Sequence, residues 1–212
     1  ALKHGYVGLN LVIQAFLNDQ SELVRKQAYL ILRERTEPRV RHVLALFSKL
    51  GINYTHLRNL LVSKRWREAD QETKALLFQV STLQQGGEEG TPERKRLTDA
   101  QIANLPCEDL QIMDRLWVKY SRGRFGFSIQ QRIWQKCYQT FWDKGEMWQV
   151  FANRVGWRES FLQSYHWRRY DELIFNLKAP EGHLPHLGDQ FGIHTVEAFS
   201  KVLTECQHTH SN

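Results

Sequence analysis

Two stretches of the chain bring aromatic rings and arginines close together. In RGRFGFS, residues 122–128, Gly126 separates Phe125 from Phe127 in what reads as a tight turn between helices. In NRVGWRESFLQSYHWRRYDEL, residues 153–173, tryptophans and tyrosines lie among four arginines without a helical period. Rings stack on flat ligands, and guanidinium groups pair with carboxylates or phosphates through two parallel hydrogen bonds. These residues therefore favour a flat aromatic anion, held in a concave apolar site with arginines at its rim.

Each stretch also has a purely structural interpretation. A turn can place its rings in the core, which accounts for at least one of Phe125 and Phe127. A solvated basic loop anchored by a few buried rings accounts for residues 153–173.

Positive charge is concentrated in the same region. From Arg115 to Arg169 there are eight arginines and three lysines against three acidic residues, a balance of +8, whereas the whole chain of 212 residues carries +6. Six of the seven tryptophans lie between Trp117 and Trp167. An isoelectric point near 9.3 leaves nucleic acid, anionic lipid or an anionic small molecule open as partners.

Catalytic and metal-binding patterns are not recognisable in the sequence. His183 and His186 flank a Leu-Pro pair, and His208 and His210 lie near the end of the chain, so a metal site is not expected. No Ser/His/Asp, Cys/His or HExxH arrangement and no phosphate-binding glycine loop occurs, so the chain is not expected to be an enzyme.

The acidic and sulfur-containing residues have unremarkable interpretations. Asp109 and Asp114 read as helix-start charge and a solvated helix face. Cys107, Cys137 and Cys206 are odd in number and far apart, so neither a disulfide nor a zinc site is indicated and a reducing compartment is favoured. No apolar run approaches the ~18 residues of a membrane span, and the first residues do not read as a signal peptide.

Hydrophobic periodicity predicts a nearly all-α protein: a compact helical bundle with a concave ligand face, preceded by a short helical pair. Apolar residues recur at helical spacing, and no alternating strand pattern of useful length appears. We expect residues 1–50 to form an N-terminal helical extension and residues 51–212 the core. The pattern LNDQSELVRKQAYLIL in the extension resembles one unit of a HEAT-type repeat, which cannot bury its apolar face alone.

Two pairs of residues have the spacing of a helix capping box. Thr98 with Gln101 predicts a short helix through Leu105, and Ser128 with Gln131 predicts a helix that starts after the RGRFGFS turn.

Four motifs resemble the genomes-uncoupled family of porphyrin-binding proteins. They occur in the family's order between about Tyr54 and Ser200, and they read LRNLLVSKRWREADQET, LPCEDLQIMDRLWVKYSRGRFGFSIQQRIW, RVGW and YDELIFNLKAPEGHLP. The resemblance implies an all-helical core shaped like a cupped hand, which binds protoporphyrin IX and Mg-protoporphyrin IX as ligands, with no covalent cofactor. It also implies that the protein stimulates magnesium chelatase in chlorophyll biosynthesis, with the chelatase's large porphyrin-binding subunit as partner.

The resemblance carries two further implications. It places the protein in the cytoplasm of a cyanobacterium or in the chloroplast stroma, with part of it associated with membranes. Cyanobacterial members carry an additional N-terminal helical bundle where residues 1–50 lie, so this segment is a truncated bundle or a divergent repeat.

The residues and the resemblance together predict a porphyrin site. Phe191 and His194 stand where the family often has arginine, so this chain departs from the family pattern in its late loop. The predicted ligand-binding residues are Phe125, Phe127, Ile129, Trp148, Phe151, Arg154, Val155, Trp157, Arg158, Trp167, Arg168, Arg169, Tyr170, Phe191 and His194.

Two other functions stay open on the sequence alone. The same rings and arginines suit a helical module that binds single-stranded nucleic acid by stacking and phosphate contacts, although the family resemblance leads us to expect none. Alternatively, the HEAT-like start makes the chain a protein-interaction scaffold.

Overall fold

The computed structural model describes residues 2–84, 97–140, 143–161, 164–186 and 188–208. Within these ranges it leaves undescribed the side chains of residues 2–6, 22, 144, 160–161, 188–194 and 208. The chain forms two compact units, Ala1–Asn53 and Tyr54–Asn212. No helix among the described residues is both long and apolar enough to cross a lipid bilayer.

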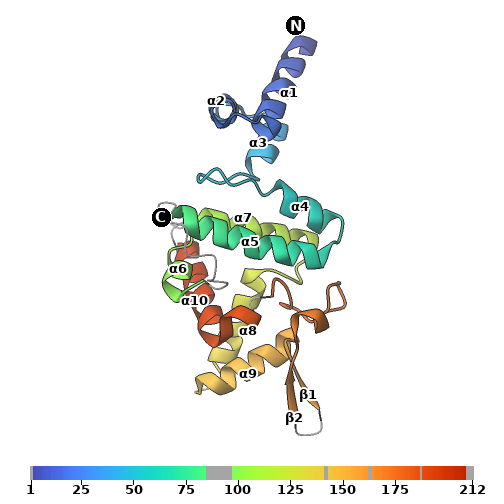
Figure 1. Ribbon diagram of the computed structural model, residues 1–212, viewed down its shortest axis with the longest axis vertical. Helices are drawn as coiled ribbons and strands as arrows, with labels where there is room; N and C mark the ends of the chain where they lie inside the picture. The colour runs from blue at the N-terminus through green and yellow to red at the C-terminus, as the bar shows by residue number, and fades with distance from the viewer. Residues whose placement is uncertain (1, 85–96, 141–142, 162–163, 187, 209–212) are drawn as a thin grey trace. The chain divides into compact units, whose positions relative to one another are not determined.

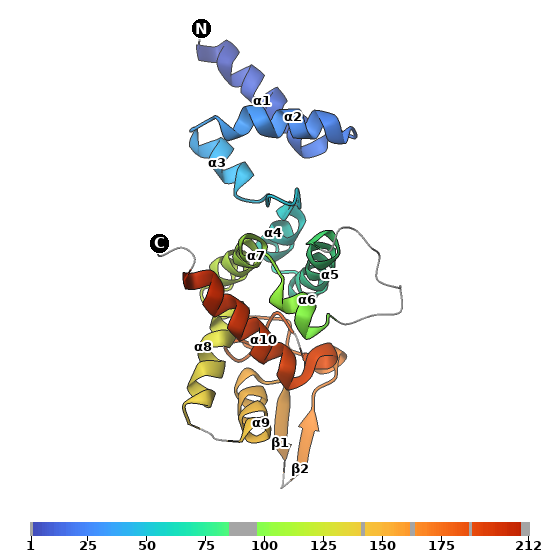
Figure 2. The ribbon, with the colours of Figure 1, turned by 90° about the vertical axis from the view of Figure 1, so that its left-hand side faces the viewer.

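The first unit is a small helical assembly with its own core. In it, α1 packs across α2 (Figure 2). Ile13 of α1, Leu32 of α2 and Val40 of α3 are buried together in the core between the helices. The helices of this unit are α1 (Leu2–Asn18), α2 (Glu22–Arg33) and α3 (Pro38–Leu44).

The second unit is mostly helical, as the sequence predicts. Figure 1 shows α5 and α7 running alongside one another, and α10 packs on α6, α7, α8 and α9. Its helices are α4 (Thr55–Val62), α5 (Trp66–Gln84), α6 (Asp99–Ala103), α7 (Cys107–Tyr120), α8 (Phe127–Tyr138), α9 (Lys144–Val155), the 3₁₀ turn η1 (Tyr170–Glu172) and α10 (Gly188–His208).

Trp117 of α7 lies at the centre of this unit. Its indole is fully buried, 6.0 Å from the ring of Trp66 on α5 and edge-on to Phe125 at 6.4 Å. A buried indole N–H requires an acceptor, and Nε1 donates to Oγ1 of Thr73 on α5 at 2.9 Å. The Trp117 side chain therefore joins α7 to α5 through ring packing and a hydrogen bond.

Of the two capping boxes predicted from sequence, only the first is present. Thr98 and Gln101 exchange both reciprocal hydrogen bonds at the start of α6. The second prediction is wrong because α8 already begins at Phe127, and the Ser128 N–H donates to Oδ1 of Asp114 at 2.9 Å. A carboxylate from the preceding helix thus caps α8.

Asp109 lies in the first turn of α7, as expected of a helix-start charge, but neither Asp109 nor Asp114 lies on a solvated face. Asp109 is buried and accepts a hydrogen bond of 2.6 Å from the hydroxyl of Tyr54. Asp114 is half-buried, and burial raises the pKa of its carboxyl above the ordinary value, although the Ser128 amide opposes that shift. Both carboxylates serve to join helices.

The structure contains a disulfide that the cysteine spacing does not indicate. Cys107, the first residue of α7, is bonded to Cys206 near the end of α10. The two cysteines are 99 residues apart, and only the packing of α10 on α7 brings their Cα atoms to 5.3 Å. Cys137 is a buried free thiol whose pKa is raised by burial. The expectation of no disulfide is therefore corrected.

The segment predicted as an irregular aromatic loop contains a β-hairpin. Strands β1 (Arg158–Phe161) and β2 (Ser164–Trp167) pair antiparallel, with Arg158 opposite Trp167 and Glu159 opposite His166. Figure 1 shows the hairpin extending beside α9, against which β1 packs. Because side chains alternate between the faces of a strand, this register decides which of the aromatic residues gather together.

Candidate functional site

The two phenylalanines of the RGRFGFS turn lie in the core. Phe125 is fully buried and packs edge-on to Trp66 at 5.7 Å, and Phe127 stacks on Phe199 of α10 at 5.4 Å. Both rings are buried in this structure, which agrees with the structural interpretation. Their assignment as ligand contacts stays a prediction.

The turn forms hydrogen bonds to residues 179–184, in the segment that precedes α10. The Gly126 N–H donates to the Leu184 carbonyl at 3.0 Å, and Nη2 of Arg124 donates to the Ala179 carbonyl at 2.6 Å. From α8, the Gln130 amide bonds the carbonyls of Gly182 and Pro185. Arg124 and Gly126 thus bind the backbone of the segment before α10.

Four more of the predicted site residues are buried. Ile129, Phe151, Val155 and Trp157 form part of the core between α8, α9 and the hairpin. The Trp157 indole N–H donates to the His183 carbonyl at 2.8 Å. In this conformation none of these four side chains is exposed to a ligand.

Three predicted residues come together on α9 and the hairpin: Trp148 and Trp167, whose rings keep accessible surface, and Arg158, which is buried at 6% exposure. Trp148 of α9 stacks on Trp167 of β2, with ring centres 5.5 Å apart and an angle of 22°. The Arg158 guanidinium lies 3.6 Å from the ring centre of Tyr165 and 5.7 Å from that of Trp167. Trp167 and Tyr165 are 44% and 58% exposed. We call Trp148, Arg158, Tyr165 and Trp167 the hairpin face.

The register explains how these side chains meet. Arg158 is paired directly with Trp167, and Tyr165 lies two residues before Trp167, so all three project from one face of the hairpin. A guanidinium over an aromatic ring is attracted by the ring's negative face. The result is a surface of exposed rings packed against a buried positive charge, which suits a flat anionic ligand.

Two arginines at the end of the hairpin, Arg168 and Arg169, are paired with carboxylates of the same segment. Arg168, on the other face of the hairpin, forms an ion pair with Glu159, and its Nη1 donates to the Glu172 carbonyl. Arg169 bonds Glu172 through its amide and its guanidinium, and the amide bond is the largest cause that lowers the pKa of Glu172 to about 2. Arg168 and Arg169 stabilise the end of the hairpin.

Tyr170 belongs to a buried polar cluster around Asp70 of α5. The carboxylate of Asp70 is fully buried and accepts from the Tyr170 hydroxyl at 2.8 Å and from the His186 amide at 2.5 Å. The Lys74 ammonium lies 3.3 Å from the same carboxylate and 4.3 Å from the Tyr170 ring centre. Burial raises the pKa of Asp70, and the Lys74 charge opposes that shift.

Of the other three predicted residues, Arg154, Phe191 and His194, only Arg154 has a described side chain. Arg154 is exposed in the last turn of α9, and its guanidinium interacts with Cys137 of α8. Phe191 and His194 lie within α10, and their side chains are outside the described part of the structure.

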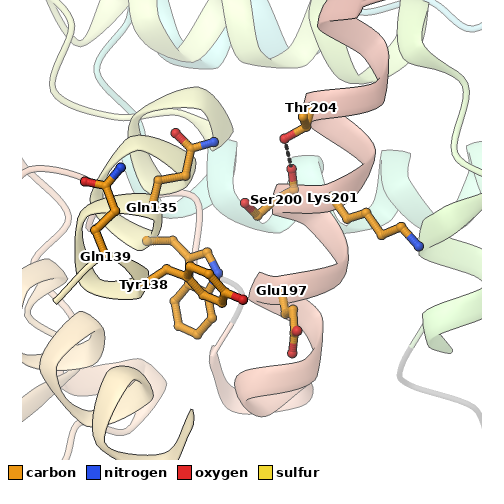
Figure 3. A pocket seen from close by; sticks show the side chains of 8 residues that line it. Gln135, Tyr138, Gln139, Glu197, Ser200, Lys201 and Thr204 are labelled. Atoms are coloured by element: carbon orange, nitrogen blue, oxygen red, sulfur yellow. Dashed lines mark hydrogen bonds between the residues drawn. The ribbon is translucent and has the colours of Figure 1, made fainter. Parts of the chain in front are cut away.

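A cleft between α8 and α10 was not predicted from sequence. Its volume is about 390 Å³, within the range of roughly 300–1,000 Å³ typical of small-molecule sites. Figure 3 shows the Tyr138 ring pointing from α8 toward Glu197 of α10, while Lys201 extends away from Tyr138. The lining residues are Trp134, Gln135, Tyr138, Gln139, Glu197, Ser200, Lys201 and Thr204.

The cleft and the hairpin face are linked by aromatic packing. Trp134 meets Phe151 edge-on at 5.5 Å, and Phe151 stacks on Trp148 at 5.9 Å.

The sequence contains signals for the residues of both surfaces that were not predicted. Trp134 and Tyr138 are four apart on one helix face, and Tyr165 alternates with Trp167 as in a strand.

The described residues contain no group of three or more His, Cys, Asp or Glu side chains able to hold a metal ion. His183 and His186, the candidates nearest the site, are buried and engaged in packing.

Comparison with known proteins places the chain in a family. A model of the family described as GUN4-like matches residues 47–202. The "Tetrapyrrole-binding protein, chloroplastic" of Arabidopsis thaliana is 35% identical over 135 residues, which are 61% of this chain and 46% of that protein. The ycf53 protein of Porphyra purpurea is 30% identical over 194 residues, 89% of this chain and 69% of that protein. The chain thus spans about half the length of the chloroplastic relative.

The fold agrees with the sequence comparison. The ligand-free structure of Arabidopsis thaliana GUN4 matches with a TM-score of 0.55 and 31% identity, over 72% of this chain and 92% of that one. The family resemblance and the all-α fold inferred from the motifs and periodicity are both confirmed. The chain belongs to the GUN4-like family.

Proposed function

We propose that this protein is a tetrapyrrole-binding regulator with no enzymatic activity of its own. The observation that carries the proposal is the hairpin face, where exposed rings surround the Arg158 guanidinium in a member of the GUN4-like family. The name of the chloroplastic relative supports the ligand class. The ligands are protoporphyrin IX and Mg-protoporphyrin IX, and the protein works in a cyanobacterial cytoplasm or a chloroplast stroma.

The energetics of such a surface suit a carrier. Removing about 300 Å² of macrocycle from water contributes roughly 7 kcal/mol, and two charge-assisted bonds to propionates add about 1.5–3 kcal/mol each. Association costs at least ~4 kcal/mol, so roughly micromolar binding follows without a metal ligand. In our proposal, Trp167 and Tyr165 contact the macrocycle, while Arg158 pairs with a propionate and Arg154 approaches a second one.

A nucleic-acid module receives less support than a porphyrin carrier. Phosphate binding needs several arginines directed outward, whereas Arg168 and Arg169 are bonded to Glu159 and Glu172. Measuring affinity at increasing salt concentration distinguishes the two functions. Affinity for nucleic acid should fall steeply with salt, whereas affinity for a porphyrin bound by stacking should fall only modestly.

The proposal is tested by replacing Trp167 with alanine. Deuteroporphyrin, a soluble porphyrin, is titrated into the protein and followed through its own Soret absorption, which does not depend on the protein's tryptophans. Loss of the Trp167 ring removes stacking worth about 1–1.5 kcal/mol, so we expect the Kd of the Trp167→Ala variant to rise roughly tenfold. Circular dichroism checks that the helices are retained.

Tyr138→Ala is the matched comparison, because it removes an exposed ring from the α8–α10 cleft instead. We expect its Kd to stay within about twofold of the unsubstituted protein. A large loss in Tyr138→Ala with none in Trp167→Ala moves the site to the cleft. Unchanged binding in both variants rules out both surfaces.

We further propose that the protein stimulates magnesium chelatase through the large porphyrin-binding subunit. The test is the rate of magnesium insertion by the reconstituted chelatase, with and without this protein. If Trp167→Ala stimulates as well as the unsubstituted chain, the hairpin face has no part in that stimulation.

A further inference from the structure

The first unit contains a pocket that the proposed tetrapyrrole site does not use. Its volume is about 520 Å³, and all of its lining residues lie within Ala1–Asn53. They come from α1, from α2 and from the turn that follows α3, and they are Phe16, Arg25, Lys26, Tyr29, Phe47, Ser48, Lys49, Leu50 and Gly51. The volume lies in the range of roughly 300–1,000 Å³ typical of small-molecule sites.

Aromatic rings form one wall of this pocket. Phe16 packs against Phe47 with ring centres 4.1 Å apart and against Tyr29 at 6.0 Å. Phe16 is buried, whereas Tyr29 and Phe47 are half-buried and keep part of their surface accessible. A flat ring entering the pocket can therefore stack against Tyr29 and Phe47.

The remaining lining is basic. Arg25, Lys26 and Lys49 give it a formal charge of +3, and no acidic side chain is among the described lining residues. Arg25 is fixed in place because its Nη1 donates to the carbonyls of Asp19 and Gln20 at 2.6 and 3.1 Å. Such a concentration of charge beside a ring wall favours an anion that carries more than one negative charge.

Ser48 supplies an independent indication that the pocket takes a ligand. Its side chain is only 5% exposed, it lines the pocket, and its Oγ has no hydrogen-bond partner in the described structure. The backbone holds it there, since the Ser48 N–H donates to the Ile52 carbonyl and the Gly51 N–H donates back to the Ser48 carbonyl. A buried hydroxyl without a partner costs free energy unless something binds it.

We propose that this pocket binds a nucleoside phosphate. The base stacks on Tyr29 and Phe47, the phosphate lies among Arg25, Lys26 and Lys49, and the Ser48 hydroxyl donates to the ligand. A phosphate fits the +3 lining better than a single carboxylate does, because it carries close to two negative charges near pH 7. Lys26 and Lys49 are exposed, so the attraction is sensitive to salt.

The proposal is tested on the full chain with adenosine monophosphate labelled by an N-methylanthraniloyl group, followed by fluorescence anisotropy. We expect saturable binding that unlabelled adenosine monophosphate displaces and that adenosine displaces at least tenfold less well, since adenosine lacks the phosphate. The double variant Lys26→Gln/Lys49→Gln should bind at least tenfold more weakly, and Ser48→Ala roughly threefold more weakly.

The matched control is Arg39→Gln/Arg41→Gln, which removes two exposed charges from α3 of the same unit but none from the pocket. It should bind within about twofold of the unsubstituted chain. Equal losses in both double variants show mere attraction to a basic unit and overturn the proposal. Adenosine competing as well as its monophosphate, or no binding at millimolar probe, also overturns it.

Porphyrin titration separates this inference from the proposed function. Lys26→Gln/Lys49→Gln should leave the deuteroporphyrin Kd unchanged, because the pocket and the hairpin face belong to different units. If deuteroporphyrin displaces the labelled nucleotide and this variant loses porphyrin affinity, the pocket is a tetrapyrrole site and the nucleotide proposal fails.

Discussion

Gly126 explains why the RGRFGFS turn has its composition. Its φ of +134° is one that L side chains rarely adopt, and an added Cβ would come within 2.7 Å of Oδ1 of Asp114 and 2.9 Å of Cγ2 of Val118. The glycine lets the turn approach α7 closely enough for Asp114 to cap α8. The glycine therefore serves the backbone geometry of the turn.

His183 is held as a neutral imidazole in one tautomer. Its Nε2 accepts from the Ile174 N–H at 3.0 Å, so the ring hydrogen is on Nδ1, which lies 2.6 Å from the Val155 carbonyl. Burial lowers the pKa of His183. His186, edge-on to Trp157 at 4.8 Å, is also buried, and burial lowers its pKa to about 3.

Replacing His186 with phenylalanine should make stability less dependent on pH. The unfolded chain takes up a proton near pH 6.5 that the folded His186 does not accept until about pH 3, so acidification below 6.5 favours unfolding. The expected cost is about 2 kcal/mol between pH 7 and pH 5. His186→Phe keeps an aromatic ring beside Trp157 and removes the titrating imidazole. The Tm of this variant should therefore fall less between pH 7 and pH 5 than the Tm of the unsubstituted protein.

The control for that measurement is His56→Gln, which changes an exposed histidine of α4. It should melt with the same pH dependence as the unsubstituted chain. Asp70, whose pKa is raised by burial, acts in the opposite direction at lower pH, and it is present in all three proteins. An unaltered pH slope in His186→Phe contradicts the assignment.

The helices and the hairpin differ in how far the sequence reveals them. Long stretches at helical spacing, such as Met113, Leu116 and Trp117, predict α7 correctly because one face is buried along its length. The hairpin strands have four residues each, too few for the alternation of Tyr165 and Trp167 to stand out. Its stability comes from cross-strand contacts and from packing on α9, which local pattern does not encode.

The disulfide between α7 and α10 should contribute measurably to stability. Linking Cys107 to Cys206 closes a loop of about a hundred residues and restricts the unfolded chain, which stabilises the native state by about 2–4 kcal/mol. Dithiothreitol should therefore lower the Tm of the oxidised protein by roughly 5–15 °C. Thiol titration of the denatured protein should find one thiol before reduction, that of Cys137, and three after it.

Cys107→Ser provides the control for the redox effect. It should melt at the reduced protein's temperature and should no longer respond to dithiothreitol, whereas Cys137→Ser should keep the response. Three thiols in the unreduced protein, or the same Tm with and without reductant, would show that the bond does not form.

At the scale of the whole molecule, the sequence indicates a basic aromatic region but not which of its charges reach a ligand. Arg154, Arg158, Arg168 and Arg169 look equivalent along the chain. The fold distinguishes them, because the hairpin register places Arg158 opposite Trp167, whereas Arg168, which follows the paired residues, forms an ion pair with Glu159. The family was thus predictable from the sequence, whereas the burial of Phe125 and Phe127 required the tertiary structure.

The two units should unfold separately. The first unit is small, with Ile13, Phe16, Ala28, Leu32 and Val40 as its buried cluster, whereas Val7, Leu11, Leu23, Leu30 and Ile31 are exposed. Small domains bury a smaller fraction of their apolar surface and are less stable. Calorimetry of the full chain should therefore show two transitions, and the lower one should be absent from a fragment of residues 54–212.

That fragment should keep the upper transition and the deuteroporphyrin affinity within about twofold, because the hairpin face, the disulfide and the Tyr54–Asp109 bond all lie inside it. Tyr54 is the first residue of this fragment, and its hydroxyl donates a hydrogen bond to one oxygen of the buried Asp109 carboxylate. Tyr54→Phe in the fragment should lose about 1–3 kcal/mol of stability without changing porphyrin affinity. A single transition in the full chain, or a fragment that does not fold, would show that the units depend on each other.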